Sequence, residues 1–276
     1  MKLTFLGTAG PDQIPSPFCD CRTCTYARKH RGYDLRKRCM YLINDDLLVD
    51  MGADLFVACS MHEVHLINTK YALVTHSHHD HFDVKNIGLR KLGYHTYEEL
   101  PVLTFVAPPS VMALLSDSDV RDADVGLKRK PILPFEQIDL YPYSIKALKA
   151  THIPSIGDAV TYLIDDGKSK VLIASDTAVY KEEVWPHLED IELDQLIIEC
   201  AVGTNTGFKA GQTRHLSVDG VGTMITKMRN INAITERTSI HATHFTHKHC
   251  LPHHEMSEVL RPMNVECAYD GLVLQF

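Results

Sequence analysis

Residues 75–81 read Thr75-His76-Ser77-His78-His79-Asp80-His81 and directly follow the apolar run Lys70–Val74. The apolar run is typical of a buried strand, and the polar residues are typical of the loop after it. Four imidazoles and a carboxylate are costly to desolvate together, and a metal ion is the usual reason for such a group. Residues two apart in extended backbone point to one side, so His76 and His78 can bind one ion. A turn at His79, whose side chain is expected to face solvent, directs Asp80 and His81 toward a second ion. The alternative is a solvated turn without metal.

The composition is typical of a globular protein with a full hydrophobic core. The chain has 276 residues, of which 45% are hydrophobic, and this size fits one large α/β domain or two small ones. A formal net charge of -7, from 35 acidic and 28 basic side chains, argues against nucleic acid as a partner. The content of 17 histidines favours a metal protein. No apolar run is long enough to span a membrane.

The first residues and the cysteines together predict a cytoplasmic protein. Residues 1–7 read at once as a strand, without the pattern of a signal peptide. Of the eight cysteines, three are clustered and five are scattered. This distribution fits reduced thiols and a metal site better than a set of disulfides.

Apolar runs and helical spacing predict strands and helices interspersed along the chain. Strands are expected at Leu3–Leu6, Met40–Ile43, Leu47–Val49, Val102–Ala107, Ser144–Lys149, Ala159–Ile164, Lys170–Ala174, Leu193–Ile198, Ser239–Ala242 and Leu272–Phe276. Helices are expected at Ala53–Met61, Val84–Leu92, Pro109–Leu115, Lys181–Leu188, Val218–Met228 and His253–Leu260. Ser217 is the expected N-cap of one helix, and Pro186 is expected to kink or shorten another. Residues 116–135 are polar and are interpreted as a surface excursion or lid. The order suggests two sheets with helices outside.

Metal-binding side chains recur where predicted strands end. His152, Asp176 and His244 each follow an apolar run directly or within a few residues. Loops held by a rigid sheet are where chemistry usually lies. One histidine at a strand end is weak evidence, since a lone histidine is more often structural. Three such residues are strong evidence when their order and context are those that a known family of metal enzymes requires.

The His-x-His-x-Asp-His order after an apolar strand resembles the metallo-β-lactamase superfamily. The resemblance implies an αββα sandwich of two mixed sheets with helices on the outer faces, formed by a single domain over residues 1–276. It assigns one ion to His76, His78 and His152, a second ion to Asp80, His81 and His244, and the bridging position to Asp176. Asp50 is then expected to orient ligand histidines without binding metal itself. A turn-capping role is the alternative for Asp50.

The ligand set distinguishes among the chemistries of this superfamily. Two neighbouring ions share a water molecule, lower its pKa and neutralise charge on an attacked phosphorus or carbonyl. A glutamate in place of His78 would indicate the di-iron oxygen-reducing branch, and a cysteine in place of Asp176 would indicate a lactamase-type zinc site. The presence of His78 and Asp176 argues against both branches. Mixed nitrogen and oxygen ligands suit zinc, manganese and iron alike.

A structural zinc site is predicted in the loop of about residues 11–26. Its Cys-x-Cys-x-x-Cys motif consists of Cys19, Cys21 and Cys24. A tetrahedral zinc needs a fourth ligand. His247 is the expected one, because its loop also carries a ligand of the catalytic site, and His249 and Cys250 compete with it. The alternative is three reduced thiols without metal.

The cysteine motif, the histidine ligands and a late His-x-x-His resemble the cyclic-phosphate phosphodiesterases of the carbon–phosphorus lyase pathway. Similar cysteine motifs occur in the B proteins of PQQ biosynthesis. The resemblance covers nearly the whole chain and implies a general acid at His215, in Arg214-His215-Leu216, with Asp80 and Asp50 completing the catalytic set. A surface histidine before a helix is the alternative. The chain departs from this family around residues 116–135 and in the loop Val202–Gln212.

The predicted function is that of a phosphodiesterase that acts on a small cyclic or nucleotide-like phosphodiester by attack of a metal-bound hydroxide. The expected cofactors are two catalytic divalent ions, zinc or manganese with iron as a further option, and one structural zinc. The expected partner is the small-molecule substrate, and a homodimer is compatible with the sequence. The alternatives are a thioester or lactone hydrolase, a tRNA-processing nuclease, and a non-catalytic metal protein of cofactor biosynthesis.

Overall fold

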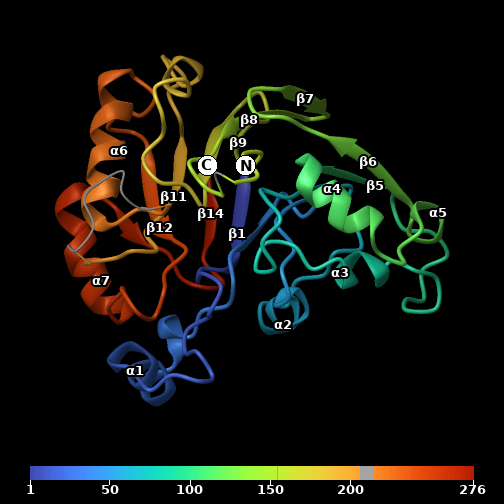
Figure 1. The fold of residues 1–276 in the computed structure, drawn as a ribbon, viewed down its shortest axis with the longest axis horizontal. Coiled ribbons are helices and arrows are strands. Elements are labelled where there is room, and N and C mark those ends of the chain that lie inside the picture. Colours follow the sequence, from blue (N-terminus) through green and yellow to red (C-terminus); the bar gives the residue numbers. More distant parts are fainter. Residues whose placement is uncertain (154, 206–213) are drawn as a thin grey trace.

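The architecture is a sandwich of two mixed sheets. The computed structural model describes residues 1–153, 155–205 and 214–276. Within these ranges two seven-stranded sheets lie face to face, and helices cover their outer sides (Figure 1). The αββα sandwich predicted from the sequence is therefore confirmed.

The first sheet is built from the amino-terminal half of the chain and closed by the carboxyl-terminal strand. Its spatial order is β14 (Val273–Gln275), β1 (Lys2–Gly7), β2 (Met40–Ile43), β3 (Leu47–Val49), β4 (Tyr71–Leu73), β5 (Leu103–Ala107) and β6 (Leu127–Pro131). Neighbouring strands from β3 to β6 are parallel, and the other pairs are antiparallel. The parallel strands end at one edge of the sheet.

The second sheet also contains both parallel and antiparallel pairs of strands. Its order is β13 (Glu266–Cys267), β12 (Ser239–Thr243), β11 (Gln195–Glu199), β10 (Lys170–Ala174), β9 (Val160–Asp165), β8 (Tyr143–Lys149) and β7 (Gln137–Leu140). Strands β10 to β13 are parallel, and β7 to β10 pair antiparallel. Because β8 and β10 flank β9, they run in the same direction and end at the same edge.

The helices form the two outer layers. They are α1 (Arg22–His30), α2 (Leu55–Met61), α3 (Lys85–Gly88), α4 (Pro109–Ser116), α5 (Asp122–Val125), α6 (Val218–Asn230) and α7 (His253–Leu260), with 3-10 turns at Gly32–Asp34, Trp185–His187 and Arg261–Met263. Figure 1 shows α6 and α7 outside the second sheet, α2 to α4 outside the first, and α1 at the lower edge of the molecule.

Strand periodicity divides the core into layers. In β3, Leu47 and Val49 belong to the cluster between the sheets, and Leu48 belongs to the cluster under α2 and α4. In β10, Val171 and Leu172 divide in the same way between the inner layer and the layer under α6. Since alternate side chains of a strand point to opposite faces, strands covered on both faces must be apolar throughout. This is why they read as continuous apolar runs.

Three sequence predictions are wrong in part. Residues 181–188 form no α-helix and contain only the 3-10 turn Trp185–His187, because Pro186 lacks an N–H group and restricts the backbone. The helix expected at Val84–Leu92 is limited to Lys85–Gly88. Residues 116–135 are no lid, since they contain α5 and the edge strand β6, which pairs with β5.

Other predictions hold, and some elements escaped prediction. Ser217 caps α6, because its Oγ accepts a hydrogen bond from Gly220 N at 3.2 Å. Helix α1 and the short strands β7 and β13 carry weak apolar patterns and were not expected. The loop Val202–Gln212 falls largely outside the described residues.

Candidate metal centre

The edge at which the parallel strands end carries the predicted ligands from both sheets. On the first sheet, Asp50 follows β3 and residues 76–81 follow β4. On the second, the contributing residues are His152 after β8, Asp176 after β10 and His244 after β12. Ligand sites of open α/β sheets are found outside the carboxyl ends of strands for the same reason, because the loops converge there. The topology thus brings together side chains that are up to 194 residues apart in the sequence, from Asp50 to His244.

One donor cluster contains three imidazoles and one carboxylate oxygen. Nδ1 of His78 lies 3.0 Å from Nε2 of His76 and 3.2 Å from Nε2 of His152. Oδ2 of Asp176 lies 3.7 Å from Nε2 of both His76 and His152. All four donors lie within 4.8 Å of one another. A small cation fits among them.

A second donor cluster uses the other oxygen of Asp176. Its Oδ1 lies 3.2 Å from Nε2 of His81 and 2.8 Å from Nε2 of His244. Oδ2 of Asp80 lies 3.3 Å from Nε2 of His81 and 3.7 Å from Nε2 of His244. Asp176 therefore faces one cluster with each oxygen, which is the geometry of a bridging carboxylate. His79 is exposed and belongs to neither cluster.

Asp50 fixes the orientation of one ring. Its Oδ2 lies 2.7 Å from Nδ1 of His81, and its Oδ1 accepts hydrogen bonds from Thr75 N at 2.8 Å and Thr75 Oγ1 at 3.0 Å. A carboxylate that holds Nδ1–H of a histidine leaves Nε2 as the lone-pair donor. Gly52 is required beside it, because a Cβ there would lie 1.9 Å from the backbone oxygen of Asp80.

The donor chemistry fits divalent metal ions. Ligands about 2.0–2.2 Å from a tetrahedral ion lie roughly 3.3–3.5 Å apart, close to the spacings of both clusters. Nε2 of His81 and Nε2 of His244 are buried without a hydrogen-bond partner among the described residues, although both lie near Asp176. Burial lowers the pKa of His76 and brings the pKa of His152 to about 4, which keeps both rings neutral and able to bind a cation.

His215 lies across both clusters. Its ring stacks on His244 with centroids 5.6 Å apart and meets the edge of His152 at 4.7 Å. Its Nδ1 lies 2.9 Å from Oε1 of Glu199. Burial by itself lowers the pKa of His215, but the carboxylates of Glu199 and Asp176 together outweigh burial and the net pKa is raised. These carboxylates therefore stabilise the charged form of the ring.

Glu199 is a site residue that sequence reasoning missed. It is fully buried at the end of β11, and its carboxylate accepts hydrogen bonds from the backbone N–H groups of Thr177, Ala201 and Leu216. An acidic residue at the end of a buried strand is the same signal that indicated Asp50 and Asp176. It escapes prediction because a single acid after the apolar run Leu193–Ile198 reads as the ordinary end of a strand.

The cysteine motif forms a separate donor cluster with His247. The Sγ atoms of Cys19, Cys21 and Cys24 and a ring nitrogen of His247 lie within 4.8 Å of one another. Nδ1 of His247 lies 3.6 Å from Cys21 Sγ, and its Nε2 lies 3.4 Å from Oδ2 of Asp12. Three thiols and one imidazole are the donor set of a structural zinc site.

The competing residues point elsewhere. Nδ1 of His249 lies 3.2 Å from Nδ2 of Asn205. Sγ of Cys250 is buried and lies 3.3 Å from the backbone oxygen of Cys200, to which it donates. Among the described residues, the structure brings His247 to the three thiols and neither competitor.

Removing one thiol of this cluster is expected to cost stability. Cys21→Ser should lose zinc and about 3 kcal/mol of unfolding free energy, because zinc binding is coupled to folding. In a chain of this size that corresponds to a melting temperature lower by roughly 5–10 °C. Zinc content and thermal unfolding measure both effects. Cys59→Ser on α2 should keep its zinc, and an unchanged zinc content in Cys21→Ser would contradict the assignment.

Comparison with known proteins identifies the family. Residues 46–261 match the beta-lactamase superfamily domain, and this region holds the complete set of histidine and aspartate donors described above. The chain belongs to the metallo-β-lactamase superfamily. No protein with curated annotation matches the sequence significantly.

Several solved structures of this superfamily share the fold. A diphosphatase of the PhnP family is 19% identical with a TM-score of 0.74, over 100% of this chain and 96% of its own. Zinc-bound PqqB from Methylobacterium extorquens is 18% identical with a TM-score of 0.78, over 100% of both chains. The short form of human tRNase Z is 16% identical with a TM-score of 0.68, over 100% and 99%. At these identities the likeness shows the fold alone. No helix within the described ranges is long and apolar enough to cross a membrane.

Proposed function

We propose that this protein is a metal-dependent phosphodiesterase that hydrolyses a small cyclic or nucleotide-like phosphodiester. One observation carries the proposal: two donor clusters share Asp176, and a histidine held by a buried carboxylate lies across both. The clusters would hold two divalent ions, which when bound supply an activated water molecule and neutralise charge on the attacked phosphorus. The structural neighbour named a diphosphatase supports a phosphate-directed reaction.

The residues around the clusters have different roles in the proposed reaction. Asp176 and Asp80 contribute carboxylate charge, which balances two divalent ions better than imidazoles alone. Asp50 holds the ring of His81 in place through Nδ1. Glu199 holds Nδ1–H of His215, so that this ring stays charged and its Nε2 carries the proton a leaving group needs. His215 is thus the general acid in this proposal.

His152, a predicted metal ligand, positions the segment that carries His215. Nδ1 of His152 lies 3.2 Å from the backbone oxygen of Arg214, to which its N–H donates. This hydrogen bond fixes the backbone of Arg214 at the rim of the site, while its side chain is exposed. An exposed guanidinium at that place can attract an anionic substrate. The acidic net charge of the chain favours a small anion over a long nucleic acid.

The test is a substrate panel with metal added back. The purified protein is supplied with zinc, manganese or iron and assayed on a cyclic phosphodiester, a bis-alkyl phosphodiester, a diphosphate-linked diester, a phosphomonoester, a thioester and a lactone. The proposal expects the highest kcat/KM on a phosphodiester. If the thioester, the lactone or the diphosphate were the preferred substrate, the proposed phosphodiester class would be wrong. No turnover with any metal would favour a non-catalytic role.

Glu199 is expected to act only through His215. Glu199→Gln keeps the size of the side chain but removes the charge, and it should lower kcat on alkyl phosphodiesters roughly 10- to 100-fold. If the two residues act as a unit, the double variant with His215→Ala should be no slower than His215→Ala alone. Glu236→Gln, at an exposed carboxylate, is the matched control.

The double-mutant cycle separates this role from a merely structural one. A carboxylate that only stabilises the loop would lower activity and melting temperature together, and its effect would add to that of His215→Ala. Additive losses in the double variant would therefore exclude Glu199 as the partner of the general acid.

A further inference from the structure

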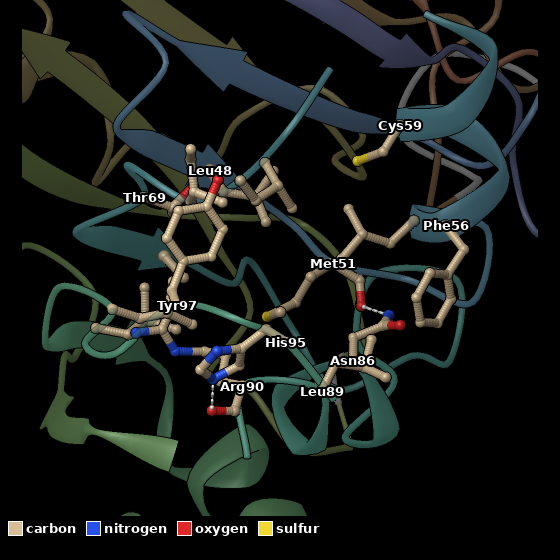
Figure 2. A pocket seen from close by; sticks show the side chains of 16 residues that line it. Leu48, Met51, Phe56, Cys59, Thr69, Asn86, Leu89, Arg90, His95 and Tyr97 are labelled. Carbon is tan, nitrogen blue, oxygen red and sulfur yellow. Dashed lines mark hydrogen bonds between the residues drawn. The ribbon is translucent and has the colours of Figure 1, made fainter. Parts of the chain in front are cut away.

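A cavity of about 270 Å³ lies outside the first sheet, behind the metal centre. Its walls come from the outer face of strands β3 to β5, from α2 and α3, and from the segments 66–69 and 89–100 (Figure 2). None of the metal-donor residues described above lines it. The cavity is therefore a feature distinct from the proposed active site.

Most of the cavity wall is apolar. Leu48, Ala72 and Leu103 project from the strands, and Met51 and Leu55 close one side. At its margin Phe56 and Tyr97 remain about half exposed, with 57% and 46% of their surface accessible. Large apolar side chains that stay accessible around an apolar cavity are typical of a ligand site, because a bound molecule would cover them.

Two buried polar atoms in this wall lack partners. Among the described residues, Oγ1 of Thr69 and Nδ1 of His95 have no hydrogen-bond partner. The other ring nitrogen of His95 lies 3.1 Å from the backbone oxygen of Arg90, to which it donates. Buried polar groups are nearly always hydrogen-bonded, so each exception calls for an explanation. A ligand that reaches both atoms is such an explanation.

The third polar group is a cation without a counter-charge. Nε of Arg90 donates to the backbone oxygen of Val125 at 3.1 Å, and Nη2 donates to that of Pro101. Among the described residues no carboxylate lies within ion-pair distance of this guanidinium. Burial lowers the pKa of Arg90. A half-buried charge is normally paired, because desolvation is costly without compensation.

The polar groups share one side of the cavity. Figure 2 shows Thr69, Tyr97, His95 and Arg90 on one side and Phe56 and Cys59 on the other. Asn86 lies beside Phe56, but its Nδ2 already donates to the backbone oxygens of Met51 and Gly52, so the polar groups without such partners lie at one end. A molecule that fits must carry one compact polar group and an apolar body. The cavity volume of about 270 Å³ corresponds to roughly nine groups the size of a water molecule, at about 30 Å³ each.

We propose that this cavity binds a small apolar monocarboxylic acid, with the carboxyl group facing Arg90, Thr69 and His95. A carboxylate accepts hydrogen bonds from a guanidinium and a hydroxyl, and it can share a proton with an imidazole nitrogen. The apolar body then covers Phe56 and the aliphatic wall. A phosphate ester would bring more charge than one guanidinium balances and would leave the apolar wall uncovered.

The cavity and the metal centre lie on opposite sides of one backbone segment. Met51 N donates to the backbone oxygen of His81 at 2.9 Å, and Nδ2 of Asn86 donates to the backbone oxygens of Met51 and Gly52 at 2.9 and 2.8 Å. The Met51 side chain lines the cavity. The proposed acid therefore binds beside the catalytic loop without entering it, and it is not the substrate.

Octanoate is a suitable probe, with octanamide as its uncharged isostere. Binding to the metal-loaded protein is measured by calorimetry, and the site is located from the methyl signal of Met51 in protein labelled at its methionine methyls. Octanoate is expected to bind at least roughly tenfold more tightly than octanamide and to shift the Met51 signal. Arg90→Gln should weaken octanoate binding roughly 10- to 100-fold, since it removes a charge-assisted hydrogen bond.

Lys91→Gln is the matched control, because it removes an exposed charge next in the sequence and outside the cavity. It should bind octanoate like the unmodified protein. If Arg90→Gln unfolds, Thr69→Val tests the same contact with an isosteric change and should weaken binding several-fold. Equal affinity for octanoate and octanamide, or unchanged binding in Arg90→Gln, would overturn the proposal. Binding that disappears in Asp176→Asn but persists in Arg90→Gln would place the carboxylate on the metal ions and also overturn it.

Discussion

Asp176→Asn should lose most of its catalytic metal and roughly 10³-fold or more in activity. The oxygens of Asp176 face separate donor clusters, so one substitution weakens both ions. Metal-ion catalysis contributes several kcal/mol to such reactions, and each 1.36 kcal/mol is a factor of ten in rate. Asparagine is the informative replacement, because Asp176 has a backbone φ of 52° and asparagine tolerates this left-handed region.

Metal analysis separates this effect from misfolding. The variant should keep the zinc of the cysteine cluster, since that cluster shares no ligand with Asp176. Its melting temperature should therefore fall far less than that of Cys21→Ser. Asp139→Ala, at an exposed carboxylate on β7, should keep full activity and metal content. An Asp176→Asn protein with both catalytic ions still bound would refute the bridging role.

His215→Ala should lose roughly 10²–10⁴-fold in kcat on alkyl phosphodiesters while it retains its metal. An alkoxide is a poor leaving group, so proton donation in the transition state matters. A nitrophenolate is already stable as an anion and needs far less help. The same variant should therefore lose little activity on nitrophenyl phosphodiesters. Kinetics on both substrates, with metal content measured in parallel, check the prediction.

The outcomes distinguish three roles for this histidine. Equal losses on both substrates with full metal content would indicate substrate positioning. Loss of metal would indicate that His215 is a metal ligand. The geometry permits this alternative, because donor atoms of Glu199, His215 and His244 lie within 4.8 Å of one another. His79→Ala, at an exposed histidine of the catalytic loop, should change neither kinetics nor metal.

The sequence predicted most of the donor residues because their signal is local. A buried strand reads as an apolar run, and a polar residue just after it lies at the sheet edge whatever the rest of the fold does. That reasoning pointed to His152, Asp176 and His244, which the structure brings together with His76, His78, Asp80 and His81. It failed for Glu199, because a single acid after Leu193–Ile198 looked like the ordinary end of a strand.

Elements with weak local signals escaped prediction. Strand β6 contains three basic residues in Leu127–Pro131 and reads as a polar loop. It is a strand because β5 offers it a parallel partner with a register that runs from Leu103 to Ala107. Pairing with a neighbour that is distant in sequence supplies hydrogen bonds that the local pattern does not reveal. The cavity beside α2 escaped for a similar reason, since its walls come from separate segments.

By itself the sequence determined the chemistry of the donor groups and the place of most strands, because residue type, apolar runs and strand ends are properties of short segments. Only the tertiary structure decided which donors meet. Cys21 and His247 are 226 positions apart and come into contact because the loop after β12 lies beside the amino-terminal loop. The two oxygens of Asp176 face different clusters because the two sheets present their strand ends at one edge. Such contacts depend on how the sheets pack, and no short segment encodes them.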